Sequence, residues 1–484
     1  MAAPSFDPAF LRLDRLLEAK SRKPAPDHGD AWREPACDSP ESEEESDEDD
    51  EDEEESHRVQ ERLERRLQER LCLRAVDANA PWPRTTMQAE PKRTSRPAPG
   101  ATVDARQRPP PPPPAVVDPF CEAEQARRLE AVLPSLRAAG GLHEHPAARP
   151  LSRSLGPGDR LLLGDESWLL MAELGRGAFA RVFRARCAGR PGEPPLAAKL
   201  SSPANLWEWH VHRRLAAELP TPAQRWLATA QAAHTLGGGA SGVLLTALVP
   251  GVTAQELVNL ARRQGRQLDE ALALLYAADL LRAVHALHAA GILHGDLKPD
   301  NVMVRCPDPA ALDARAPLAG GGGWAAQGVV LIDFGRAVDT RAYAPGTAFR
   351  SADAVADGFA SPETLAGRPW TFEIDSFAAA ATAHFLLHAQ FLHLAGGAGR
   401  RRPQAPLKRY WQAALWAPLF DALLNAPLEG GRPDLGAHAA RLLGHFDAAD
   451  DGARRRAHLK QALLQQFALL SQGISGEAGL LRRG

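Results

Sequence analysis

A change in residue pattern near position 150 sets the limits on what this 484-residue chain can fold into. Upstream of it lie an acidic run over 41–55, a stretch rich in Pro, Arg and Thr over 81–108, and six consecutive prolines at 109–114. The acidic run holds 13 carboxylates whose mutual repulsion opposes compaction, and consecutive prolines favour the extended polyproline conformation. We therefore expect residues 1–150 to form a largely disordered tail that contains only short helices.

Short helices are predicted in this tail where apolar residues recur at helical spacing, over 6–17, 59–71 and 121–139. A helix as short as the first is marginal on its own, so its apolar stripe needs a cover. Docking near Glu208 of the folded region and binding to a partner are two alternatives, and a disordered segment is the third.

Charge, cysteines and hydropathy narrow the class of protein. The net charge is −3, but outside the acidic run 57 basic groups face 47 acidic ones. The five cysteines are scattered without a CxxC pair, which argues against a disulfide framework and a zinc ribbon and favours a reducing compartment. The N-terminus lacks the basic-then-apolar pattern of a secretory signal, and no stretch approaches about 20 uninterrupted apolar residues. The sequence predicts a soluble intracellular protein with no membrane segment.

From about residue 160 the pattern predicts strands first and helices afterwards. Apolar stretches alternate with turns over 160–200, as in antiparallel strands. Helical patterns follow at 207–218, 254–264, 269–290, 371–394, 408–426 and 457–472. This order predicts an α+β fold in which a small β-rich lobe joins a larger helical lobe.

A glycine-rich hairpin lies between two of the predicted strands and contains Gly175, Gly177, Ala180 and Val182. Glycines let the backbone approach a phosphate closely, and Val182 can cover an adenine ring. Because a strand rather than a helix follows, a Rossmann dinucleotide turn is excluded. Most glycine-rich hairpins are only hairpins, so this signal alone is weak.

Lys199 lies in an apolar strand segment, 196–200, that also contains Ala197. A buried ammonium group needs a partner, and Glu208 on the next predicted helix can provide it. Such a pair would hold the α- and β-phosphates of a nucleotide. The alternative is a Lys side chain on the surface.

The most informative segment is 292–301, which contains Asp296, Lys298 and Asn301. Phosphoryl transfer to a hydroxyl needs a carboxylate to accept the proton, a cation near the moving phosphate and an oxygen ligand for magnesium. These three side chains can supply all of them from one loop. Asp333, which ends a predicted strand 32 residues after Asn301, adds a second oxygen ligand for magnesium.

This ordered set of motifs, closed by Ala-Ser-Pro-Glu at 360–363, resembles the eukaryotic protein kinase family. The resemblance implies a bilobal kinase domain over 160–475, with an N-lobe at about 160–248 and a C-lobe at about 252–475. It also implies ATP and Mg²⁺ as cofactors. The residues that match the family's motifs are Gly175, Gly177, Ala180, Val182, Ala197, Lys199 and Glu208 for ATP, Asp296 and Lys298 for catalysis, and Asn301 and Asp333 for Mg²⁺.

Further motifs resemble the Bub (budding uninhibited by benzimidazole) family of spindle-assembly-checkpoint serine/threonine kinases. They are Gly-x-Gly-Ala-Phe-Ala-x-Val at 175–182, Pro-Ala-Asn-x-Trp-Glu at 203–208 and His-Gly-Asp-Leu-Lys-Pro-Asp-Asn at 294–301. The resemblance implies protein substrates, a histone tail among them, and kinetochore and checkpoint proteins as partners. No direct nucleic-acid site is identified. The large helical-repeat region common in the family has no counterpart in the tail.

The family resemblance also implies a location in the nucleus, at chromosomes and kinetochores, with the cytoplasm as the alternative. Residues 91–96, Pro-Lys-Arg-Thr-Ser-Arg, are a modest candidate for nuclear import. An ordinary basic linker explains that segment equally well.

One departure from the common kinase pattern concerns regulation. Gly295 stands where most kinases have the Arg that binds a phosphorylated activation segment, so we expect activity without that phosphorylation. Asp357 is a candidate fixed charge in the substrate-binding stretch, and a plain solvated Asp is the alternative.

Two other functions compete with an active serine/threonine protein kinase. A pseudokinase scaffold keeps the fold but commonly loses the Lys, the base or the magnesium Asp, and Lys199, Asp296 and Asp333 are all present. A small-molecule kinase is the other alternative. The long activation segment and its Ala-Ser-Pro-Glu ending favour a polypeptide substrate instead.

Overall fold

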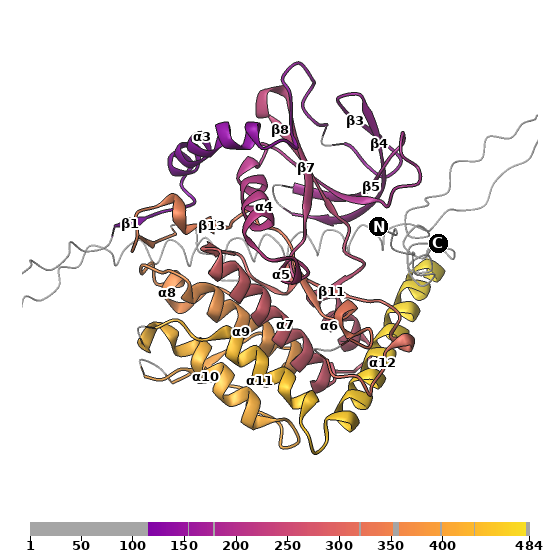
Figure 1. The fold of residues 1–484 in the computed structure, drawn as a ribbon, viewed down its shortest axis with the longest axis vertical. Helices are drawn as coiled ribbons and strands as arrows, with labels where there is room; N and C mark the ends of the chain where they lie inside the picture. Colours follow the sequence, from indigo (N-terminus) through magenta and orange to yellow (C-terminus); the bar gives the residue numbers. More distant parts are fainter. Residues whose placement is uncertain are drawn as a thin grey trace, which may run out of the picture. The chain divides into compact units, whose positions relative to one another are not determined.

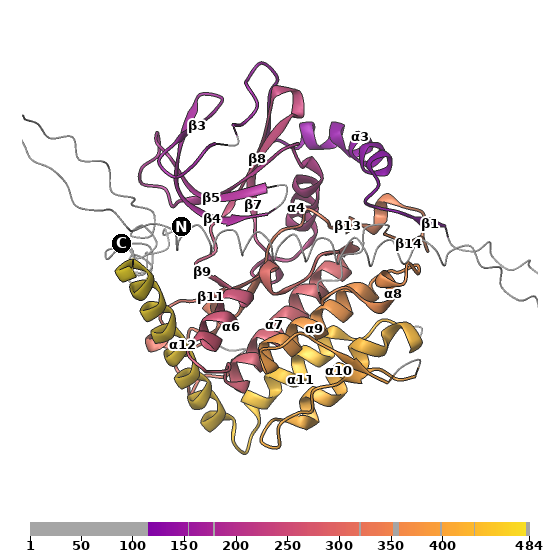
Figure 2. The ribbon, with the colours of Figure 1, turned by 180° about the vertical axis from the view of Figure 1, so that it is seen from behind.

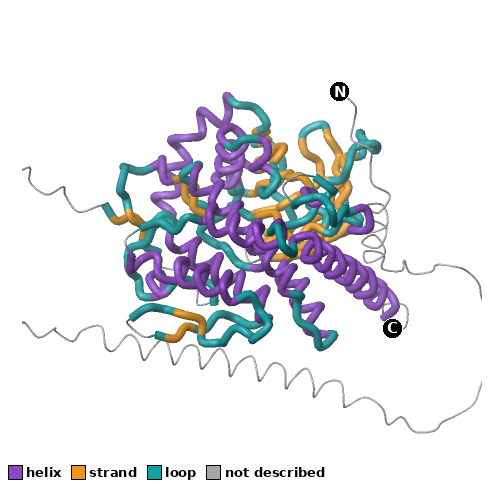
Figure 3. Tube along the Cα trace, turned by 60° about the horizontal axis from the view of Figure 1, so that its bottom comes forward, coloured by secondary structure: helices purple, strands orange, loops and turns teal. Residues whose placement is uncertain are grey.

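The computed structural model describes residues 115–152, 154–177, 180–318, 321–351, 358–396, 399–429 and 431–480. The acidic run, the polyproline segment, the first two predicted helices, the candidate import segment and Asp357 lie outside these residues. Within them, strands gather in one lobe and most helices in the other (Figures 1 and 3). The predicted α+β two-lobed fold is confirmed.

The smaller lobe is built on one seven-stranded sheet with the order β2-β7-β8-β6-β5-β4-β3. Its strands are β2 (Leu142–His145), β3 (Arg160–Leu163), β4 (Glu166–Arg176), β5 (Ala180–Cys187), β6 (Leu196–Ser201), β7 (Ala230–Leu236) and β8 (Ser241–Ala247). Burial alternates along β6, so that Ala198 faces the hydrophobic core while Ala197 and Lys199 face the opposite side. Helices α4 (Leu206–Glu218) and α5 (Thr221–Gln224) connect β6 to β7.

The larger lobe is a set of helices in which α7 and α9 are buried along most of their length. The helices are α6 (Ala254–Arg263), α7 (Glu270–Ala289), α8 (Pro362–Leu365), α9 (Glu373–His388), α10 (Ala413–Glu429), α11 (Leu435–Asp447) and α12 (Gly452–Leu480). By length and composition α7 could cross a membrane, but 83% of its apolar window is buried inside the fold, as in the core helix of a globular domain. Helix α11 was not predicted from the sequence.

Short strands and 3₁₀ turns occur in the segments that connect the longer elements. One small sheet has the order β12-β11-β9, and two pairs, β10 with β13 and β15 with β16, are antiparallel. The strands are β9 (Gly251–Thr253), β10 (Ile292–Leu293), β11 (Val302–Arg305), β12 (Val329–Leu331), β13 (Val338–Asp339), β14 (Ala348–Phe349), β15 (Leu394–Ala395) and β16 (Arg402–Pro403). The 3₁₀ turns are η1 (Gly237–Gly239), η2 (Pro299–Asn301), η3 (Pro309–Ala311), η4 (Trp324–Ala326) and η5 (Thr340–Ala342).

The folded domain begins earlier than the sequence pattern indicated. Residues 1–150 were expected to be tail, but β1 (Val116–Val117), α3 (Glu122–Ala138) and β2 belong to the folded part of the chain, and Figure 2 shows β1 and α3 beside the two lobes. Strand β2 pairs in parallel with β7, and β1 pairs in parallel with β14. The predicted helix at 121–139 is confirmed as α3, but it is part of the folded domain.

Four consecutive glycines at 320–323 are typical of a mobile surface loop, but the described residues of the stretch 305–328 contribute to the core. Trp324 and Leu312 are each 4% exposed and belong to the main hydrophobic cluster. The indole N–H of Trp324 donates to the carbonyl oxygens of Asp313 and Ala316, at 3.1 and 3.2 Å. The large apolar ring fixes a segment whose glycines had suggested mobility.

Candidate active site

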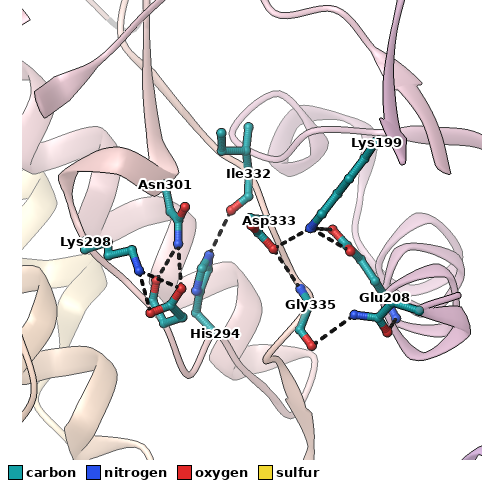
Figure 4. A network of polar contacts seen from close by, with 10 residues as sticks. Lys199, Glu208, His294, Lys298, Asn301, Ile332, Asp333 and Gly335 are labelled. Atoms are coloured by element: carbon teal, nitrogen blue, oxygen red, sulfur yellow. Dashed lines mark hydrogen bonds and ion pairs between the residues drawn. The ribbon is translucent and has the colours of Figure 1, made fainter. Parts of the chain in front are cut away.

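Lys199 is the centre of a three-element ion cluster (Figure 4). Its ammonium nitrogen lies 2.8 and 3.0 Å from the two carboxylate oxygens of Glu208 and 2.7 Å from Oδ1 of Asp333. Glu208 reaches this position because α4 begins one turn earlier, where the Asn205 side chain accepts a hydrogen bond from the Glu208 N–H. The predicted Lys199–Glu208 pair is formed, and the magnesium-ligand candidate Asp333 joins it.

The electrostatics of this cluster favour a charged Lys199. Burial opposes the ammonium form, but the Glu208 and Asp333 carboxylates outweigh it and raise the pKa of Lys199. Burial likewise opposes ionisation of Asp333, and Lys199 outweighs it and lowers the pKa of Asp333. Burial raises the pKa of Glu208, so this carboxylate depends on Lys199 to remain ionised. Removing the lysine would leave two carboxylates close together without a counterion.

Asp333 is held in an unfavourable backbone conformation. Its φ is +62°, a left-handed value that costs about 1 kcal/mol or more for a residue with a side chain. Two contacts on Oδ1 offset this cost, the ion pair with Lys199 and a hydrogen bond from the Gly335 N–H at 3.2 Å. The strain aims the carboxylate between the lobes.

Phe334 anchors the chain immediately after Asp333. Its ring is completely buried and contacts His212 of α4 and His294, with ring centroids 5.1 and 5.3 Å apart. Burial lowers the pKa of His212 to about 4, so this imidazole is neutral at neutral pH and packs as an aromatic ring. A continuous stack therefore joins α4 to the catalytic loop.

Asp296, Lys298 and Asn301 lie together in the loop after β10, on the opposite side of the site from Lys199 (Figure 4). The Lys298 ammonium is 3.0 Å from the Asp296 carboxylate. The Asn301 amide N–H groups donate to the Asp296 carbonyl at 2.7 Å and to its Oδ2 at 3.1 Å. Because the amide nitrogen is used here, the amide oxygen of Asn301 is left to face a cation. The three predicted residues are brought together.

Asp375 of α9 positions this loop and was not identified as a site residue from the sequence. It is 1% exposed and accepts the backbone N–H groups of His294 and Gly295, at 2.7 and 3.0 Å. His288 contacts it at 3.0 Å. Burial opposes ionisation, but the contacts with His288 and the loop outweigh it and lower the pKa of Asp375. A motif search misses such a residue because its partners are about 80 positions away.

The glycine-rich hairpin closes the small-lobe side of the site. Gly175 pairs with Val182 across the β4–β5 ladder, and Val182 in turn pairs with Lys199 on β6. The Gly177 N–H donates to the Ala180 carbonyl at 2.8 Å. Ala197 lies two residues before Lys199 and on the same face of β6. The nucleotide-site candidates of the small lobe thus lie on three adjacent strands, except for Gly177 in the turn between β4 and β5 and Glu208 on α4.

The oxygen donors of Asn301 and Asp333 suit a hard cation such as Mg²⁺. No group of three or more His, Cys, Asp or Glu side chains able to hold a metal occurs among the described residues. Mg²⁺ prefers six oxygens and commonly takes some from phosphates and water. The chain's own donors therefore fit an ion that arrives together with a nucleotide.

The segment before β2 braces both α4 and the activation segment, and sequence reasoning missed this. The Arg128 guanidinium of α3 is 3% exposed and lies 4.5 Å from the ring of Trp207 in α4 and 5.4 Å from the ring of Tyr343. The Phe120 ring stacks on Trp370 with ring centroids 6.2 Å apart, and the Arg336 guanidinium lies 4.1 Å from the centroid of the Phe120 ring. The only signal in the sequence was the helical spacing over 121–139.

The activation segment ends in a buried ion pair. Glu363 of α8 is 7% exposed and pairs with Arg401 at 2.5 Å and with Arg368 at 3.1 Å. This ion pair attaches the Ala-Ser-Pro-Glu stretch, which was predicted to end the activation segment, to the larger lobe.

Comparison with known proteins agrees with this geometry. The family model described as protein kinase domain matches residues 234–399. In the crystal structure of the BubR1 kinase domain, 99% of that chain and 73% of this one superpose with a TM-score of 0.62 at 22% identity, a likeness of fold. The described region therefore has the fold of a protein kinase domain, and residues 234–399 match that family's model.

Sequence comparison refines the class. Over 268 residues the chain is 30% identical to the mitotic checkpoint serine/threonine-protein kinase BUB1 of Arabidopsis thaliana, which covers 54% of this chain and 50% of that one. Over 266 residues it is 33% identical to the spindle assembly checkpoint kinase BUB1 of Saccharomyces cerevisiae, covering 54% of this chain and 26% of the relative. Over these residues the chain is similar to Bub1 checkpoint kinases. The match spans half the length of the first relative and about a quarter of the second.

Proposed function

We propose that this protein is an active serine/threonine kinase that transfers the γ-phosphate of ATP to protein hydroxyls. The observation that carries the proposal is the Lys199 cluster, in which one ammonium contacts both Glu208 and Asp333 within 3.0 Å. Phosphoryl transfer depends mainly on positioning and charge stabilisation, and this cluster supplies a cation and a carboxylate already in place.

Each side chain has a distinct part in the transfer. Lys199 holds the α- and β-phosphates, and Glu208 keeps its ammonium in position. Asp296 accepts the proton of the attacking hydroxyl, while Lys298, 3.0 Å from it, lies where the moving phosphate gains charge. The breaking bond is the γ-phosphorus to β,γ-bridging oxygen bond, and the ADP leaving group keeps its electron pair.

Asn301 and Asp333 would hold Mg²⁺, which neutralises charge on the phosphate oxygens. Gly175, Gly177 and Ala180 would bring backbone close to the phosphates, and Val182 with Ala197 would enclose the adenine.

We further propose a role in the mitotic spindle checkpoint, in the nucleus at kinetochores and chromatin, with a histone tail among the substrates. The relatives named mitotic or spindle-assembly checkpoint kinases support this setting. A tagged protein that remained cytoplasmic throughout mitosis would contradict the location and leave the kinase proposal intact.

The test is transfer of labelled γ-phosphate to a panel of chromatin and kinetochore proteins by the full chain. The control is the Asp333→Asn variant, which keeps the shape of the side chain but weakens its hold on magnesium. We expect transfer by the unmodified chain and a loss of several kcal/mol of transition-state stabilisation in the variant, at about 1.4 kcal/mol per tenfold in rate. Nucleotide binding with equal background labelling in both would instead indicate a scaffold with a kinase fold.

A further inference from the structure

Asp339, six residues after Asp333, is the meeting point of α4 and the beginning of the activation segment. Its side chain is 3% exposed, and its Oδ2 lies 3.0 Å from Nε2 of His210. The Arg214 guanidinium pairs with the same oxygen, and the Arg341 N–H donates to Oδ1 at 3.0 Å. Both carboxylate oxygens are therefore occupied by groups from defined elements.

The contacts of Arg214 extend this network. Besides Asp339, it donates to the Ala290 carbonyl at the end of α7, at 3.1 Å, and pairs with Glu218 at 2.8 Å. Glu218 also pairs with Arg341 at 2.6 Å. One guanidinium thus connects α4 to α7 and, through Asp339, to β13.

The network fixes the rotation of α4 as well as its position. His210 and Arg214 are one helical turn apart and share a face, whereas Glu208 points from a different face toward Lys199. A helix held on two faces cannot roll without breaking one set of contacts. Holding His210 and Arg214 on Asp339 therefore keeps Glu208 directed at Lys199.

Most kinases have an arginine at the position of Gly295, where it binds the phosphorylated activation segment. Such a side chain does not fit this loop. Gly295 has φ +74°, and a Cβ at this position would lie 2.5 Å from the Arg336 carbonyl oxygen. A side chain here would require the backbone to move. His210 and Arg214 of α4 are instead already paired with a carboxylate that the chain carries permanently.

We propose that Asp339 is a positioning residue that supplies, as a fixed charge, what a phosphate on the activation segment supplies elsewhere, and so holds α4 with the Lys199–Glu208 pair closed. The inference rests on the proposed kinase function. It assigns His210 and Arg214 as the residues on which this charge acts, and none of the three touches nucleotide or acceptor.

The test compares two buried carboxylates. Asp339→Asn keeps the acceptor for the Arg341 N–H and removes the charge. Asp279→Asn on α7 is the matched control, because the Asp279 side chain is also 3% exposed and lies 3.9 and 3.7 Å from the guanidinium groups of Arg225 and Arg282. The readouts on the full chain are kcat, the KM for ATP, the thermal midpoint and hydrogen exchange over 206–218.

We expect Asp339→Asn to lower kcat about tenfold or more, to raise the KM for ATP several-fold and to speed exchange in α4 selectively. Arg214→Gln should reproduce this effect, and the double variant should be no worse than either single one. Asp279→Asn should lower the thermal midpoint without changing exchange in α4.

Unchanged kcat and α4 exchange in Asp339→Asn would overturn the proposal, as would effects that match those of Asp279→Asn. If the unmodified chain showed no transfer, the kinase function would fail, but exchange in α4 and nucleotide affinity would still test Asp339 independently.

Discussion

The nucleotide side and the acceptor side of the site are held in different ways. Lys199 and Asp333 are in contact across 134 positions of sequence, and Glu208 comes from a third element. Asp296, Lys298 and Asn301 are instead connected within one loop, through contacts two and five residues apart. One half of the site is assembled by tertiary packing and the other mainly by local backbone geometry.

This difference indicates where each half is vulnerable. The acceptor side keeps its shape as long as its loop stays attached to Asp375. The nucleotide side depends on the placement of α4, which in turn depends on Arg128, on Asp339 and on the stack through Phe334. Remote substitutions should therefore affect the nucleotide half selectively.

The largest expected effect separates the two halves directly. Asp296→Asn should lower kcat by about 10²- to 10⁴-fold, because the acceptor hydroxyl loses its general base. Its affinity for ATP should remain close to that of the unmodified chain, since Asp296 does not hold nucleotide. Lys199→Met should lose both transfer and nucleotide affinity. Calorimetric titration with magnesium-ATP measures the difference, and a loss of affinity in Asp296→Asn would remove the distinction between the halves.

A smaller effect is expected from the brace on α4. Arg128→Ala removes the buried guanidinium between Trp207 and Tyr343, and we expect a fall in kcat of about tenfold through misplacement of Glu208. Arg127→Ala is the matched control, because its side chain is 60% exposed and its guanidinium pairs with Glu124 within the same helix. Steady-state rates of the two variants decide the point. Equal rates would mean that α3 is packed on α4 without supporting it.

A further effect is expected on stability against pH. The pKa of His212 is lowered to about 4 in the fold, from an ordinary value near 6.5, so between these values the unfolded chain binds the additional proton. This contribution to stability is therefore complete above about pH 6.5 and is lost as the pH falls toward 4, with a cost of about 2 kcal/mol at pH 5.

His212→Gln should reduce the difference in free energy of unfolding between pH 7 and pH 5, measured by urea titration. His285→Gln, at an exposed position, is the control and should leave the difference unchanged. An unaltered difference in His212→Gln would show that this histidine is not buried in neutral form.

The sequence predicted best what is local. The proximity of Asp296, Lys298 and Asn301 could be predicted because they lie within one short segment, and the long helix α7 followed from its continuous apolar pattern. The Lys199–Glu208 pair was predicted because a lysine in a buried strand needs a partner and a carboxylate follows soon after.

What the sequence missed depends on distant partners. Arg128 occupies a position that a helical pattern marks as polar, yet it is 3% exposed because two aromatic rings cover it. Asp339 and Asp375 resemble ordinary acidic residues until their partners, more than 80 positions away, are brought beside them. The start of the domain was misplaced for the same reason, since β2 is four residues long and gains its stability only by pairing with β7.

We expect the nucleotide side of the site to assemble without phosphorylation of the activation segment. The most direct test is the initial rate of γ-phosphate transfer after phosphatase treatment of the purified chain. We expect this rate to match that of the untreated chain, because Gly295 offers no receptor for a phosphate and His210 and Arg214 of α4 are already paired. A large fall in rate, reversed by phosphorylation at Thr340, Thr347 or Ser351, would contradict the account.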